Sequence, residues 1–157
     1  MRSAFTLVEI LIVVIILGIL AAITVPKLSD AASDSESAML KSNASLLQKQ
    51  IELYIIQHGG KGPHLNEQGK SNSGQFVERM TSKTDPTGKI NSSGSCGPYI
   101  DEWPKNPRIS NAALADKVQI DGWPNGQNGW WYSTDYQTII ASDPESVQDY
   151  LAGLKGK

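Results

Sequence analysis

The stretch from Phe5 to Val25 reads FTLVEILIVVIILGILAAITV and is almost wholly apolar. A helix of about 21 residues is roughly 30 Å long, which matches the hydrocarbon thickness of a bilayer. Only a helix can satisfy the backbone hydrogen bonds of one such segment in lipid. The stretch therefore predicts a membrane-spanning helix over residues 5–26.

The flanks of this helix bear on its orientation. Arg2 and the initiator amine lie on the short N-terminal side, so the positive-inside rule favours a head outside the cytoplasm. Lys27 on the other flank keeps this charge bias small. The apolar run exceeds the roughly 7–15 residues of an ordinary signal peptide core, and no Ala-x-Ala site follows it. A plain membrane anchor leaves Glu9 unexplained, because a carboxylate within a spanning helix is costly and usually marks function.

The opening Ala4-Phe5-Thr6-Leu7-Val8-Glu9, followed by the apolar run and Pro26, resembles the class III signal of type IV prepilins and type II secretion pseudopilins. The resemblance implies a leader peptide of residues 1–4, cleavage between Ala4 and Phe5 by a prepilin peptidase, and N-methylation of Phe5. It also implies that Glu9 meets the Phe5 amine of a neighbouring subunit during assembly, and that Gly18 and Pro26 loosen the helix in a filament. The family usually has Gly before the cleavage site. Ala4 is the smallest replacement, so we expect cleavage to proceed.

Residues 27–58 continue as the amphipathic half of the same helix, because they contain no Gly or Pro before Gly59-Gly60. Charged positions on this segment, such as Asp30 and Lys49, are expected to face water. The apolar positions near helical spacing predict a stripe toward a globular head. This stripe comprises Leu28, Ala32, Met39, Leu46, Leu47, Tyr54 and Ile55.

Residues 59–157 form the head, with loops, a sheet and a short C-terminal helix. A short helix is expected over residues 75–83, with Phe76, Val77 and Met80 inward. Three strands are expected at 117–121, 129–134 and 137–141, joined as an antiparallel meander. Ser142-Asp143-Pro144-Glu145 predicts the start of a last helix that runs to about Leu154. The fold class is thus α+β and pilin-like, a long N-terminal helix packed on a small antiparallel three-stranded sheet.

One further segment bears on the branch of the family. Residues 97–104 resemble the Gly-Pro-Tyr-x-x-x-Trp-Pro connection of major pseudopilins. Aromatic residues gather further along, and strand alternation sends Trp130 and Tyr132 to one face and Trp131 to the other. The first face is expected to pack on the helix. The second is expected to be open to a subunit contact or a ligand.

Several function classes lack support. The net charge is −2 with scattered basic residues, which argues against nucleic-acid binding. Cys96 is the only cysteine, so no intrachain disulfide can form, and a partly buried residue or an intermolecular thiol contact remains. His58 and His64 are expected to be exposed on a loop. Calcium is conceivable through Asp135, Asp143 and Asp149, but their spacing matches no pattern, and we expect no metal, no cofactor and no catalytic site.

The resemblance implies a structural subunit of a type IV pilus-like or type II secretion pseudopilus filament. It also implies a set of partners: further copies of the chain, minor pilin-like subunits, the prepilin peptidase, an inner-membrane platform protein and an assembly ATPase. The chain would cross the inner membrane once before it joins a periplasmic or extracellular filament. The alternative is a membrane-tethered module whose exposed head aromatics capture a polysaccharide or another surface ligand.

Overall fold

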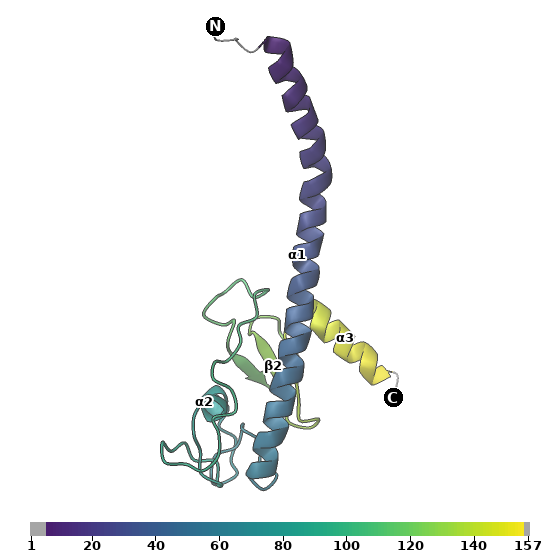
Figure 1. Cartoon of the computed structure of the whole chain (residues 1–157). Coiled ribbons are helices and arrows are strands. Elements are labelled where there is room, and N and C mark those ends of the chain that lie inside the picture. Colours follow the sequence, from purple (N-terminus) through teal and green to yellow (C-terminus); the bar gives the residue numbers. More distant parts are fainter. Residues whose placement is uncertain (1–5, 156–157) are drawn as a thin grey trace. The chain divides into compact units, whose positions relative to one another are not determined.

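The computed structural model describes residues 6–155, with helices α1, α2 and α3, the short 3-10 helix η1 and strands β1 to β3 (Figure 1). The chain divides into two compact units, Met1–Ala38 and Met39–Lys157. Helix α1 (Leu7–Gln57) contributes to both, and it continues through Pro26. The two units are therefore described in turn.

In the first unit, α1 carries an apolar surface that none of the described residues of the unit covers. The large apolar side chains between Leu7 and Val25 each expose about half of their surface or more, with fractions from 51% to 83%. The helix is long and apolar enough to cross a membrane. The helix expected from residues 5–26 is confirmed over its described part.

In the second unit, α1 ends where the two glycines predict it. Gly59 and Gly60 have φ angles of 65° and 90°, a backbone conformation that favours glycine. The Gly60 amide donates a hydrogen bond to the Ile55 carbonyl over 2.8 Å, as in a Schellman cap. The chain thus leaves the helix at a defined point.

The buried stripe of α1 confirms part of the expected one, since Leu47 and Tyr54 are buried as predicted, and corrects the rest of it. Leu40, Leu47, Ile51 and Tyr54 are each at most 1% exposed. Met39 and Leu46, which were expected to face inward, are 42% and 48% exposed, and Leu28 is 71% exposed. A stripe spaced alternately by three and four residues is narrow, so neighbouring leucines cannot both lie on it.

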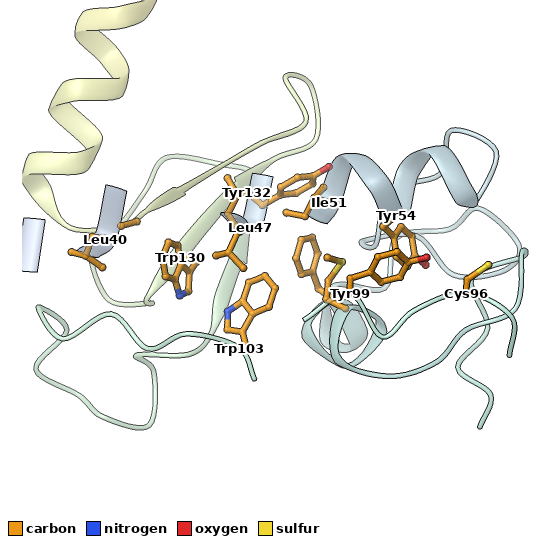
Figure 2. Close-up of a cluster of buried hydrophobic side chains, with 13 residues drawn as sticks. Leu40, Leu47, Ile51, Tyr54, Cys96, Tyr99, Trp103, Trp130 and Tyr132 are labelled. Carbon is orange, nitrogen blue, oxygen red and sulfur yellow. The ribbon is translucent and has the colours of Figure 1, made fainter. Parts of the chain in front are cut away.

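This stripe packs against the rest of the second unit in one apolar cluster (Figure 2). Tyr99 and Trp103 reach the cluster from the proline-rich segment after Cys96, which forms neither helix nor strand. Cys96, expected to be partly buried, is only 8% exposed and is therefore more deeply buried than predicted. The Tyr99 hydroxyl also donates to Gln57 Oε1 over 2.7 Å, which fastens this segment to the end of α1.

Three strands form at the expected places, but their pairing corrects the expected meander. The strands are β1 (Val118–Ile120), β2 (Trp130–Ser133) and β3 (Thr138–Ala141). The β2–β3 pair is antiparallel, whereas β1 and β2 run parallel, so the sheet is mixed. A three-residue strand rises only about 10 Å. The loop over residues 121–129 is therefore long enough to return the chain to the end of the sheet where β1 began, so that β2 can run parallel to β1.

Helix α3 (Pro144–Lys155) begins as predicted and covers the second face of the sheet. Asp143 Oδ1 accepts a hydrogen bond from the Ser146 amide over 3.2 Å, which caps the helix, and Pro144 takes the first helical position. The Trp131 and Tyr150 rings lie 5.7 Å apart, centroid to centroid. The sheet is thus packed between α1 on one face and α3 on the other.

The loops before the sheet are held by one buried arginine on α2 (Phe76–Thr81), which follows η1 (Ser73–Gln75). Phe76 and Met80 are buried as expected, and Val77 is partly buried against the same cluster. Arg79 is 1% exposed, and the acceptors of its guanidinium among residues 6–155 are all neutral oxygens. These acceptors are the carbonyl oxygens of Pro63, Asn72 and Gly88 and the side-chain oxygen of Gln75.

Both histidines depart from the expected exposed loop. His58 is 2% exposed, its ring stacks on Tyr54 at 3.8 Å, and its nitrogens lie 2.7 Å from the Tyr54 carbonyl and 2.9 Å from Thr84 Oγ1. His64 is partly buried beside Tyr132, with ring centroids 5.6 Å apart. Burial lowers the pKa of His64. His58 follows Tyr54 by four residues, so it lies on the buried stripe.

Candidate functional site

The first turn of α1 brings together two polar residues at the head of the apolar helix. The Thr6 amide and the Thr6 hydroxyl both donate to Glu9 Oε2, each over 2.8 Å. The Glu9 amide in turn donates to Thr6 Oγ1 over 3.3 Å. This reciprocal arrangement is a capping box, with Thr6 at the N-cap and Glu9 at the third helical position.

The capping box gives Glu9 a local role that the sequence reasoning missed. The pattern Thr-x-x-Glu before an apolar run is the sequence signature of a capping box and could have predicted this role. A carboxylate in the first turn also interacts favourably with the positive end of the helix dipole. Thr6 satisfies hydrogen bonds but carries no charge, so the negative charge of Glu9 has no cation in its own turn.

The surroundings of Glu9 make that charge stand out. Glu9 is the only charged residue between Thr6 and Pro26. Its neighbours Val8 and Ile10 are 60% and 53% exposed. The site is therefore one carboxylate on an open apolar surface, fixed in position by its own turn.

The other residues expected at this site lie in different situations. Ala4 and Phe5 fall outside the described residues, so the expected cleavage and methylation stay predictions. Gly18 lies within α1 with open space where a side chain would be. Pro26 lies inside the same helix without interrupting it, although proline cannot donate the backbone hydrogen bond of that turn. Loosening at Gly18 and Pro26 stays a prediction about a filament.

The three aspartates considered for calcium lie in different surroundings and do not form one site. Asp143 caps α3 and pairs with Arg108 over 3.1 Å. Asp149 pairs with Lys41 over 3.0 Å, and Asp135 lies in the turn after β2. Over residues 6–155, no three His, Cys, Asp or Glu side chains gather in a way that could hold a metal ion.

The environment of Asp143 favours its charged form. Burial on its own would raise the pKa of Asp143, but the hydrogen bonds from Ser146 and the Arg108 guanidinium outweigh this effect and hold the pKa below its usual range. Asp143 is thus a structural carboxylate at the junction of β3 and α3.

The aromatic residues of the head divide differently from the expected pattern. Trp130 and Tyr132 are fully buried toward α1, as expected (Figure 2). Trp131, which was expected on an open face, is only 7% exposed because α3 covers that face. Within the described residues, the exposed aromatic side chains are those of Trp123 and Tyr136, at 68% and 64%. Both lie in turns, where strand alternation gives no information.

Comparison with known proteins adds two findings. A family model described as the prokaryotic N-terminal methylation motif matches residues 1–25. The chain is also similar to the type II secretion system core protein G of Pseudomonas aeruginosa, with 27% identity over 156 residues. The match covers 99% of this chain and 86% of that protein. No solved structure matches the chain significantly.

Proposed function

We propose that the chain is a member of the pilin and pseudopilin family and a structural subunit of a type II secretion pseudopilus. A methylation motif at the start of an apolar helix supports a filament subunit. The similarity along nearly the whole chain to a type II secretion core protein favours that machine over a pilus or a DNA-uptake filament. The family consists of structural subunits, and the chain is not an enzyme.

The observation that carries the proposal is the placement of Glu9. Among residues 6–155, its carboxylate is held in the first turn of an exposed apolar helix by the neutral donors of Thr6. Away from water, such a charge is stabilised most by a cation that forms a charge-assisted hydrogen bond. Cleavage after Ala4 creates one, because the new amine of Phe5 is positively charged. The amine of a neighbouring subunit then pairs with Glu9 and brings the apolar helices together.

The proposed route has three steps. The precursor crosses the inner membrane once with its head outside the cytoplasm, and a prepilin peptidase removes residues 1–4 and methylates Phe5. A platform membrane protein and an assembly ATPase then add the subunit to a filament, alongside minor pilin-like subunits. The contact joins Glu9 of one copy to Phe5 of another, so it is head-to-tail and generates an open helical filament.

The charge of Glu9 can be separated from its capping role. Glu9→Gln keeps the capping box, since glutamine serves at the same position, but removes the charge. We expect normal membrane insertion and a loss of roughly tenfold or more in sheared filament, as expected when a buried ion pair loses one partner. Asp30→Asn removes an exposed carboxylate from the same helix and should leave the filament yield unchanged. Equal yields from both variants would exclude Glu9 from assembly.

Processing is tested on the protein from its native membrane, with and without the peptidase. The intact mass of the mature chain should correspond to residues 5–157 with one added methyl group. A mature chain that retains Met1–Ala4 would contradict the proposed processing.

A further inference from the structure

A groove of about 410 Å³ opens on the side of the head formed by α3 and the two turns that flank β2. Its floor is made by Trp131 and by the apolar side chains of α3, namely Val147, Leu151 and Leu154. Volumes of this size are typical of sites that enclose one small ligand or one large side chain. The assembly site on α1 shares none of these residues.

Aromatic rings surround the groove. Trp123 and Tyr136 line it and are mostly exposed, at 68% and 64%, so their surfaces are available to a partner. Trp131 and Tyr150 line it from within. The Tyr150 hydroxyl is shielded from solvent and has no hydrogen-bond partner in the described part of the chain. The site thus offers four aromatic rings and one unused polar atom.

The charge around the groove has one sign. Asp121 and Asp135 line it, and no Lys, Arg or His among the described residues does so. Both oxygens of Asp121 accept hydrogen bonds from Thr134, each over 2.7 Å, so this carboxylate is fixed in place without being neutralised. Asp135 takes part in no ion pair or hydrogen bond within residues 6–155. Within the described part of the chain, the groove therefore combines aromatic faces with two negative charges that no cation compensates.

We infer that this groove binds the cationic side chain of an arginine or lysine presented by a partner polypeptide. A cation over an aromatic face is attracted by the ring quadrupole, and nearby carboxylates add to that attraction. Arg and Lys also have an apolar stem below the charged group, and the apolar floor supplied by α3 suits that stem. This site is separate from filament assembly and does not depend on it.

The composition of the groove favours this occupant over a sugar. A saccharide carries hydroxyl groups all around its ring, and a floor of valine and leucine would leave those that reach it without hydrogen bonds, at a cost in free energy. A basic side chain makes its polar contacts only at its tip, where Asp121 and Asp135 lie. A neutral apolar side chain would use the floor but not the carboxylates.

The test uses the full chain in a polyoxyethylene detergent, whose head group is neither a cation nor a sugar. The probes are N-acetyl-arginine methylamide and its neutral isostere N-acetyl-citrulline methylamide, followed by the indole signal of Trp123 in nitrogen-15 NMR spectra. We expect the arginine probe to shift this signal and to bind at least about threefold more tightly than the citrulline probe. Raising the salt concentration should weaken binding of the arginine probe alone.

Three variants locate the site. Trp123→Ala and Asp135→Asn should each weaken binding of the arginine probe, by roughly threefold or more. Asp101→Asn removes another exposed carboxylate outside the groove and should bind as the unmodified chain does. Equal affinity for both probes, a Trp123 shift saturated by cellobiose instead, or no shift with any probe would each overturn the inference.

Discussion

Gly129 shows how much of the head depends on one residue without a side chain. Its amide donates to the Leu114 carbonyl over 2.8 Å, and its carbonyl accepts from the Ser142 amide and from Asn106 Nδ2. Three segments of the chain therefore meet at its backbone. A Cβ atom at this position would collide with the backbone carbonyl of Ala115.

We predict that Gly129→Ala lowers the free energy of unfolding by about 3 kcal/mol, since backbone rather than a flexible side chain must move. Gly153 is the matched control, because it lies inside α3 with open space around it. Gly153→Ala should stabilise the head by about 0.5–1 kcal/mol through helix propensity. Urea unfolding followed by tryptophan fluorescence measures both. Changes of the same sign would contradict the steric argument.

The residues at the N-terminus were the most predictable from sequence, and the reason is chemical. One carboxylate in an otherwise apolar run is improbable without a function, so the sequence singles out Glu9, and its role in assembly stays a prediction. Its bond to Thr6 was missed, although the spacing of the two residues was visible. His58 was placed on an exposed loop because two glycines follow it. Its spacing from Ile51 and Tyr54 would have placed it on the buried stripe.

At the scale of elements, patterns predict what forms but not how it pairs. Residue alternation located β1, β2 and β3 within one or two residues, and the Asp143-Pro144 pair located α3. Alternation is the same for parallel and antiparallel neighbours, so the direction of β1 could not be derived from it. The packing of α3 over Trp131 could likewise not be predicted from the sequence pattern, because tertiary contacts determine where a helix docks.

The orientation of α1 in the head gives a direct prediction. Leu47 is fully buried and Leu46 is 48% exposed, although they are neighbours of the same type. Leu47→Ala should lower the free energy of unfolding by about 2–5 kcal/mol through the lost contacts and the cavity. Leu46→Ala should change it by less than about 1 kcal/mol. Comparable losses from both variants in urea unfolding would mean that the buried stripe is placed wrongly.

At the scale of the whole molecule, one average conceals two kinds of surface. The mean hydropathy of the chain is −0.28, typical of a water-soluble protein. In the first unit the apolar residues stay exposed, which suits lipid or other apolar helices. The buried apolar residues of the described chain run from Leu40 to Val147, so all of them lie in the second unit. The first unit thus exposes an apolar surface suited to lipid, whereas the second unit buries its apolar residues in a core as a protein in water does.

This division predicts that a chain beginning at Met39 folds without the first unit. All four tryptophans lie beyond Met39, so the near-UV circular dichroism of the shortened chain should match that of the full chain. Its melting temperature should lie within a few degrees of the full chain in detergent, because the core is complete. In a detergent phase-separation assay, the shortened chain should enter the aqueous phase and the full chain the detergent phase. Loss of the near-UV signal, or continued partition into detergent, would show that the head depends on the apolar helix for its own core.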